Sequence, residues 1–275
     1  MKCWIVSPMD GTEWLRKEPE RQDSTRFTPA EVATEAIALR LARAAGLDAA
    51  ESAVALWAEG ERTRKGLISK KFTRGLDELS SGNSHLSRKS PHDYDPSRRE
   101  LHTLQRVRDV LMDLEETTGT SFLTPFAQML AFDAWVGHAD RHQENWSTIR
   151  SGNAMRLAPL YDTAACLGRE LGDGDRHLRA PHVVPDKYLL ACPSGFGDGR
   201  SKRLRFQREI VNELSENWPE WQAGIGLWLA KFQEVLEQVE TFFEQIGPEW
   251  LSNDRKNFAH AILTRRLEWL RLESK

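Results

Sequence analysis

Hydrophobic spacing changes at about residue 98 of this chain of 275 residues, and the change limits the folds that the chain can adopt. Before that point, apolar residues occur in short runs separated by turn-forming residues. Beyond it they recur every three or four residues, which is helical spacing, beginning with Leu101, Leu104, Val107, Leu111 and Leu114. A strand-rich first part followed by a larger helical part predicts a two-lobed α+β fold.

The first part contains the signals of a hairpin and of one long helix. Two β-favouring runs within residues 3–17 flank the turn sequence Ser7 to Gly11, which predicts a hairpin. The sequence Thr28-Pro29-Ala30-Glu31 has the form of a capping box, so a helix is expected from there to near Gly46. Residues 52–58 and 66–72 are predicted to be further short strands.

We therefore expect three parts: an N-lobe over residues 1–73, a polar connecting loop over 74–98, and a helical C-lobe over 99–275. The loop is expected because its sequence is rich in Ser, Gly, Asp and His. In the C-lobe, one helix is predicted to begin near Ser97 and another to run from Thr124-Pro125 through Trp135. Several aromatic residues of the last third fall at near-helical intervals and are expected to form core.

Charge and cysteine content narrow the environment and the partners of the chain. The formal net charge is -3 with both signs interspersed, so neither direct nucleic-acid binding nor membrane attachment is expected. The three cysteines are widely spaced and indicate reduced thiols rather than a zinc site. Without a signal-peptide pattern or an apolar run of membrane-spanning length, the sequence predicts a soluble, cytoplasmic protein.

The strongest chemical signal is the sequence Gly137-His138-Ala139-Asp140-Arg141-His142-Gln143-Glu144-Asn145, placed between a predicted helix and a short predicted strand. Phosphoryl transfer requires a carboxylate that accepts the proton of the attacking hydroxyl and an amide oxygen that holds a metal ion. One short loop can supply both. Asp140 is therefore the candidate catalytic residue, and Asn145 is a candidate metal ligand.

Three further residues complete a phosphoryl-transfer set. Asp162 ends an apolar run downstream and is the candidate second metal ligand. Lys17 ends a predicted strand, and Glu35 lies on the apolar face of the predicted helix, where a carboxylate normally has a cationic partner. A strand lysine paired with a helix glutamate would hold the phosphates of a nucleotide. The expected cosubstrates and cofactors are ATP and Mg2+.

Other interpretations of the same residues remain open. The histidines at 138 and 142, together with Asp140 and Asp162, could form the metal centre of a phosphohydrolase or nuclease. A small-molecule kinase of the aminoglycoside type would use a similar loop. A pseudokinase or nucleotide-sensing subunit would keep the fold without turnover.

The segments Gly137 to Asn145 and Ala158 to Asp162 resemble the catalytic and metal-binding segments of HipA-family kinases, and in particular a compact branch typified by the cell-translocating kinase A. The likeness extends to residues 35–47 and to the helix entry at Trp250-Leu251-Ser252. It implies a bacterial serine/threonine protein kinase, often belonging to a toxin-antitoxin or effector system. A protein substrate is implied, an antitoxin or a complementing subunit is left open as a partner, and secretion as an effector is left open too.

The sequence departs from the family pattern at two points. Where family members place a glycine- or serine-rich phosphate loop, this chain has only the Ser7 to Gly11 turn. That turn is a degenerate loop, or the start has been trimmed, or a partner supplies the missing strands. The segment that begins at Asp162 also continues Thr-Ala rather than Phe-Gly, so gating by a phenylalanine at this point is not expected.

Overall fold

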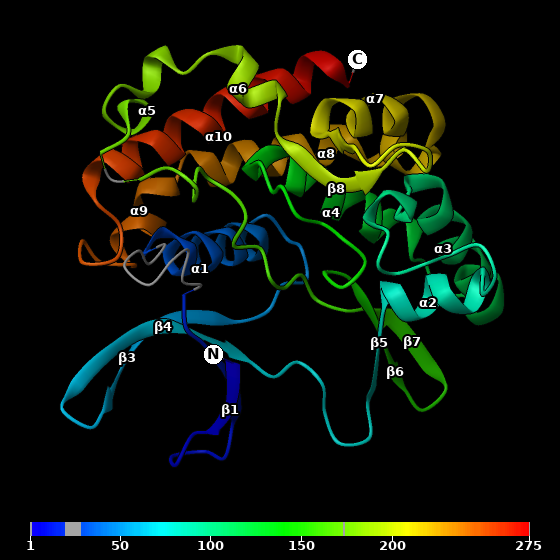
Figure 1. The fold of residues 1–275 in the computed structure, drawn as a ribbon, viewed down its shortest axis with the longest axis horizontal. Helices are drawn as coiled ribbons and strands as arrows, with labels where there is room; N and C mark the ends of the chain where they lie inside the picture. The colour runs from blue at the N-terminus through cyan, green and yellow to red at the C-terminus, as the bar shows by residue number, and fades with distance from the viewer. Residues whose placement is uncertain (1, 20–28, 173, 275) are drawn as a thin grey trace.

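The computed structural model describes residues 2–19, 29–172 and 174–274. Its smaller lobe is an antiparallel sheet in the order β1-β2-β4-β3, at the bottom of Figure 1. The strands are β1 (Lys2–Val6), β2 (Glu13–Lys17), β3 (Ser52–Glu59) and β4 (Arg62–Lys70). The predicted hairpin is confirmed, since β1 and β2 pair across the expected turn. The two later strands are longer than predicted and are joined by a tight turn at Glu59 to Arg62.

Helix α1 (Pro29–Ala44) lies between this sheet and the helical lobe, as Figure 1 shows. It contacts β3 and β4 on one side and α9 (Val239–Glu244) on the other. Its many alanines, including Ala33, Ala36 and Ala42, are almost fully buried, and their small side chains allow this close packing on both sides. The predicted capping residue Thr28 lies outside the described residues.

The expectation that residues 74–98 form a loop throughout was wrong, because this segment contains strand β5 (Glu78–Ser81) and helix α2 (Gly82–Lys89). β5 pairs with β6 (Ser147–Ser151), which pairs in turn with β7 (Ala154–Leu157), so the strand is stabilised by residues far away in sequence. Ser81 caps α2 by accepting a hydrogen bond from the backbone N–H of Ser84. The polar residues that suggested a loop therefore serve as strand edge and helix cap. The division into three parts itself stays a prediction.

The larger lobe is built around α4 (Leu123–Val136), which is buried along nearly its whole length. Against it pack α8 (Pro219–Leu236) and α10 (Asn253–Glu273). Trp135 of α4 stacks on Phe232 of α8 with ring centroids 4.6 Å apart, so these aromatic residues form core as expected. The predicted helix through Trp135 is confirmed.

The helix expected from Ser97 begins instead at Leu104, because Thr103 caps it by accepting from the N–H of Arg106. Residues Arg99–Leu101 form only a short 3₁₀ turn, η1. The remaining elements are α3 (Leu104–Thr118), α5 (Arg176–Arg179), η2 (Pro181–Val183), α6 (Asp186–Leu190), β8 (Pro193–Gly197), β9 (Leu204–Phe206) and α7 (Gln207–Asn217). None of the helices in the described part of the chain is long and apolar enough to cross a membrane.

Candidate active site

A buried ion-pair network joins the two lobes at their interface. The ammonium group of Lys17, at the end of β2, donates to Glu35 Oε1 of α1 at 2.7 Å and to Asp162 Oδ1 at 3.1 Å. Lys17 and Glu35 expose only 11% and 5% of their side chains. The predicted strand lysine and helix glutamate therefore do meet, and a carboxylate 145 residues further along the chain meets them.

The pKa values of this network follow from burial and charge together. Burial lowers the pKa of Lys17, but the carboxylates of Glu35 and Asp162 oppose burial more strongly, so the pKa lies above its ordinary value. Burial raises the pKa of Asp162, yet the ammonium groups of Lys17 and Lys2 outweigh it and lower the pKa to about 2. Asp162 therefore carries a full negative charge at neutral pH, which suits a metal ligand.

The catalytic-loop candidate, residues 138–145, begins where α4 ends. Gly137 caps the helix in the left-handed conformation with φ 68°, which glycine adopts without strain. Arg141 then donates to both carboxylate oxygens of Asp133 at 2.8 Å, and the side chains of this pair expose 1% or less. Arg141 also donates to the backbone oxygen of Asn145. A bidentate buried pair of this kind fixes the path of the loop.

Asn145 closes the same loop from its other end. Its side-chain nitrogen donates to the backbone oxygen of Asp140 at 2.7 Å, which leaves the side-chain oxygen available to a ligand. The two loop residues predicted from the motif are thus held together by their own hydrogen bond. This arrangement fits a metal ligand, because an amide oxygen is a hard donor of the kind that Mg2+ takes.

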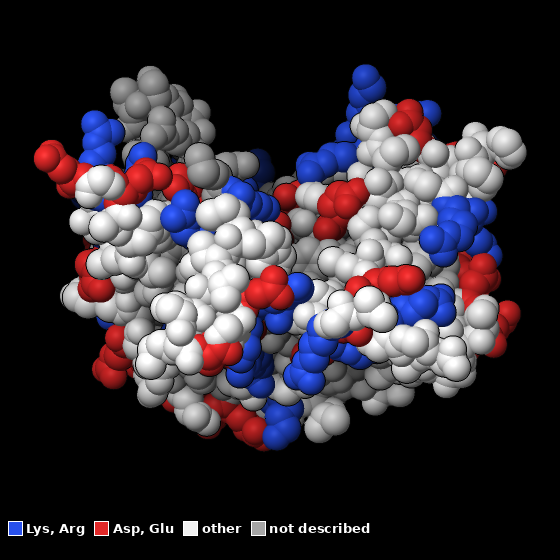
Figure 2. Space-filling view, turned by 90° about the horizontal axis from the view of Figure 1, so that it is seen from below, with Lys and Arg blue, Asp and Glu red and all other residues white. Residues whose placement is uncertain are grey.

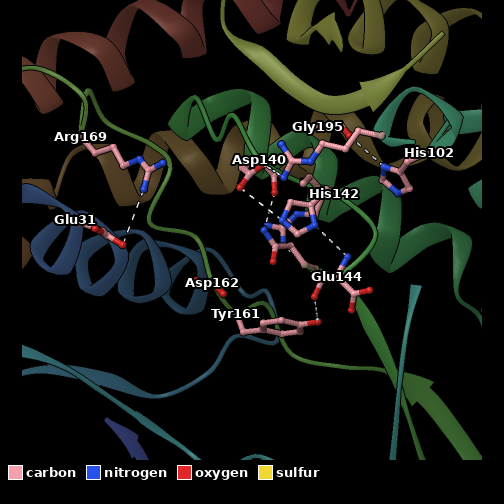
Figure 3. A network of polar contacts seen from close by, with 12 residues as sticks. Glu31, His102, Asp140, His142, Glu144, Tyr161, Asp162, Arg169 and Gly195 are labelled. Atoms are coloured by element: carbon pink, nitrogen blue, oxygen red, sulfur yellow. Dashed lines mark hydrogen bonds and ion pairs between the residues drawn. The ribbon is translucent and has the colours of Figure 1, made fainter. Parts of the chain in front are cut away.

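Asp140 itself is partly exposed, with 36% of its side chain accessible. Its Oδ1 accepts from the guanidinium of Arg99 at 3.2 Å, and its Oδ2 lies 3.6 Å from His142 Nε2. Figure 3 shows His142 beside Asp140, with Tyr161 and Asp162 on the segment below them. Asp140 is therefore a partly exposed carboxylate, which suits a group that must exchange a proton.

The segment that carries Asp162 is fastened to both lobes. The hydroxyl of Tyr161 hydrogen-bonds to Ser147 Oγ at 2.6 Å and to the backbone oxygen of Glu144 at 2.8 Å. Thr34 of α1 donates to the backbone oxygen of Ala164 at 3.1 Å. Asp162 has φ 53°, an uncommon backbone conformation for a residue other than glycine. This conformation is stabilised by the contacts on both sides and turns the carboxylate toward Lys17.

All five predicted site residues line one cleft of about 890 Å³ between the lobes: Lys17, Glu35, Asp140, Asn145 and Asp162. Figure 2 shows the surface hollowed near its upper edge, with acidic and basic side chains together at the hollow. In the described part of the chain, no group of three or more His, Cys, Asp or Glu side chains is arranged to hold a metal ion. The donor set that fits Mg2+ here is one carboxylate, Asp162, and one amide oxygen, Asn145.

Two cationic residues of this site were missed by the sequence analysis. Lys2 pairs with Lys17 across the hairpin and places its ammonium 3.2 Å from Asp162 Oδ2. The hairpin register carried this signal, since residues directly opposite on two strands point to the same face. Arg99, which meets Asp140, had no signal in the local sequence.

The Ser7 to Gly11 turn does not line the cleft. Asp10 instead closes the turn by accepting from the N–H and hydroxyl of Thr12, and a side-chain hydrogen bond from Ser7, followed by these two from Thr12, lowers the pKa of Asp10 to about 2. A carboxylate at this position disfavours a phosphate group. The turn therefore contributes no residue to the walls of the cleft.

Comparison with known proteins bears on the family and the fold of the chain. The model of the HipA-like C-terminal domain family matches residues 1–246. No curated protein matches the sequence. Among solved structures, the Helicobacter pylori proinflammatory kinase CtkA is similar with a TM-score of 0.77 and 15% identity, over 99% of this chain and 92% of that one.

The Shewanella oneidensis toxin-antitoxin protein HipA, solved with HipB and operator DNA, is similar with a TM-score of 0.60 and 15% identity. The match covers 98% of this chain and 63% of that one. At such identities the likeness shows the fold, and the predicted α+β kinase-like fold is confirmed. Because the family model matches most of the chain, the chain belongs to the HipA-like C-terminal domain family.

Proposed function

We propose that this protein is a Mg2+-dependent kinase that transfers the γ-phosphoryl group of ATP to a serine or threonine hydroxyl of another protein. The observation that carries the proposal is the meeting of Lys17, Glu35 and Asp162 in the cleft that Asp140 and Asn145 also line. These are the groups that phosphoryl transfer requires, and they come from both lobes.

The nucleotide is proposed to enter from the side of the N-lobe sheet. A cavity of about 440 Å³ adjoins the main cleft and shares Lys2, Lys17, Glu144 and Asp162 with it. Its apolar walls suit a flat nucleobase and include Phe72 and Tyr161, which stack with ring centroids 5.8 Å apart. A base held there would direct its phosphates toward the ammonium of Lys17.

Lys17 is the phosphate-binding residue in this proposal. Its ammonium group attracts the α- and β-phosphates, and Glu35 holds that ammonium in place from the helix side. Asp162 and Asn145 are the residues that would hold Mg2+, which when bound neutralises phosphate charge and orients the γ-phosphoryl group. The ammonium of Lys2 already lies at Asp162 Oδ2, and this contact supports a cation site at that oxygen.

Asp140 is proposed to orient the acceptor hydroxyl and to receive its proton. The hydroxyl oxygen forms a bond to the γ-phosphorus, the bond from that phosphorus to the β,γ-bridging oxygen breaks, and ADP leaves with the electron pair. The partial exposure of Asp140 supports this role, because an acceptor carried by another protein must reach it.

We propose that the reaction takes place in the cytoplasm with a protein substrate. An antitoxin or a complementing subunit is proposed as a further partner, since the Shewanella HipA structure contains HipB. A pseudokinase is the second candidate function. It is favoured by one observation, that the Ser7 to Gly11 turn does not line the cleft.

The deciding experiment incubates the protein with γ-labelled ATP and Mg2+ in a lysate of proteins and compares Asp140→Asn with wild type. Label that appears on protein with wild type and not with Asp140→Asn supports the kinase. Equal labelling by the two would contradict the role of Asp140. Binding of Mg2+-ATP by both proteins without any transfer of label would establish the pseudokinase instead.

A further inference from the structure

A second cavity, of about 530 Å³, adjoins the main cleft on the C-lobe side of Asp140. The two spaces share Asp140, Ala165 and Arg169 in their walls. The residues proposed to act on the nucleotide or its metal ion line only the main cleft. They are Lys2, Lys17, Glu35, Asn145 and Asp162. Asp140 therefore stands between a space suited to a triphosphate and a separate space open to an acceptor.

The walls of this acceptor cavity are apolar at the back and basic elsewhere. Val136, Leu167 and Ile262 are among its apolar residues. Arg99 and Arg169 line it with side chains that are 51% and 33% exposed, and they pair with Asp140 at 3.2 Å and with Glu31 at 4.0 Å. Glu170, the one acidic wall residue besides Asp140 in the described part of the chain, is engaged by the hydroxyl of Tyr188.

Arg266 adds a buried positive charge beneath the cavity. Its Nε and Nη1 donate to the backbone oxygens of Ala134 and Leu189 at 2.6 and 2.7 Å, and only 2% of the residue is exposed. Among the described residues, no carboxylate lies within ion-pair distance of it, and its Nη2 has no hydrogen-bond acceptor. The thiol of Cys192 is a side-chain hydrogen-bond partner of Arg266, but burial raises the pKa of this thiol, so Cys192 does not supply a compensating negative charge. A buried guanidinium without an acidic partner makes the cavity attractive to anions.

Arg99 connects this cavity to the chemistry at Asp140. Its guanidinium pairs with Asp140 Oδ1 at 3.2 Å, while 51% of its side chain is exposed. An acceptor hydroxyl must bind a carboxylate oxygen of Asp140, and His142 already lies beside the other oxygen. Since Arg99 belongs to a short 3₁₀ turn and is half exposed, its side chain can leave Asp140 with little cost.

We infer that the cavity lined by Arg99 and Arg169 binds an acidic peptide segment whose serine or threonine replaces Arg99 at Asp140. The displaced guanidinium then pairs with a carboxylate of the peptide next to the acceptor residue, so one ion pair is exchanged for another. This inference rests on the proposed kinase function and adds its substrate class: acidic segments are preferred to neutral ones, and basic segments are disfavoured by like charge.

The test uses synthetic peptides with a single central serine, flanked by Asp and Glu, by Asn and Gln, or by Lys. Their kcat/KM values are measured with Mg2+-ATP for wild type, Arg99→Gln and Arg99→Glu. Arg98→Gln is the matched control, because Arg98 directly precedes Arg99, is similarly exposed, and pairs with Glu100 rather than with Asp140. Fluorescence anisotropy of the same peptides, labelled with fluorescein, gives their affinities independently of turnover.

We expect wild type to use the acidic peptide best and Arg99→Gln to lose roughly fivefold of that preference, the size of a partly exposed ion pair. Arg99→Glu should favour the lysine peptide, whereas Arg98→Gln should behave as wild type. Two results would overturn the inference in a protein that still binds Mg2+-ATP. One is equal use or equal affinity of the three peptides by wild type, and the other is a preference for the acidic peptide that survives in Arg99→Glu. Failure to bind Mg2+-ATP in calorimetry would instead overturn the proposed function itself.

Discussion

Lys17→Met tests the buried ion pair that fastens β2 to α1. Methionine keeps most of the apolar stem and removes the ammonium, so Glu35 would remain in its buried position without its cation. Breaking one side of a buried pair costs about 3–5 kcal/mol, and the low exposure of both side chains leaves little solvent to reduce that cost. Asp162 keeps Lys2 as a partner and adds little. For a chain of this size we expect the melting temperature to fall by roughly 6–10 °C.

The loss should depend on pH in a definite direction. Burial raises the pKa of Glu35 above its ordinary value of 4.5, and Lys17 is the main influence that lowers it. In the variant the pKa of Glu35 in the folded protein is therefore higher still. Between the unfolded and the folded pKa, Glu35 keeps its proton in the folded protein and has lost it in the unfolded chain. Stability is kept below the unfolded pKa and is lost as the pH rises through the raised folded pKa. The variant should lie close to wild type at pH 5 and furthest from it at pH 8.

Thermal melts followed by circular dichroism at pH 5 and pH 8 would measure this, with the double variant Lys17→Met/Glu35→Gln as the control. The double variant should recover most of the stability at pH 8, since a neutral amide replaces the unpaired carboxylate. A Lys17→Met protein that melts with wild type at pH 8 would refute the reasoning, as would a double variant no more stable than the single one.

Three further outcomes are expected. Gly66→Ala should weaken Mg2+-ATP binding in calorimetry, although residue 66 is not proposed to touch the nucleotide. A Cβ at residue 66 would lie 2.2 Å from the backbone oxygen of Lys17, so strand β2 would have to move. Unchanged affinity would contradict this. Burial lowers the pKa of His102 to about 3, so the free energy of unfolding measured in urea should fall by about 1.4 kcal/mol per pH unit, from this residue, as the pH falls below 6.5. A His102→Asn protein that loses as much stability with pH as wild type would argue against this. Asp133→Asn should leave Arg141 buried without its carboxylate and cost about 3 kcal/mol or more in the same melts, whereas a loss below 1 kcal/mol would show that the pair does not fix the loop.

Local sequence was enough to predict the parts of the fold that depend on neighbouring residues. The hairpin followed from its turn, and α4 followed from the helix-start signal Thr124-Pro125, because both are short-range features. β5 and α2 were missed because both contact β6, a strand about 70 residues away: β5 pairs with it, and His85 of α2 hydrogen-bonds to Thr148. A polar strand paired at long range has the same local composition as a loop.

The candidate site shows the same limit. The spacing of Asp140 and Asn145 in the motif predicted that both lie in one loop. The place of Glu35 on the apolar face of α1 predicted that it needs a cationic partner. The contact between Arg99 and Asp140 has no such signal, because it depends on where η1 lies in the folded protein. The catalytic, nucleotide and metal roles of the five site residues stay predictions until the variants are measured.

The packing of α1 on both sides has a consequence for how the protein can be controlled. A helix that is free on one side can rotate and carry its glutamate away from the lysine, which gives a kinase an inactive form. Here rotation of α1 would pull alanine and leucine side chains out of contact with β3, β4 and α9 at once, and water would have to cover them. Rotation of α1 is therefore costly in this molecule, and Glu35 is expected to stay beside Lys17.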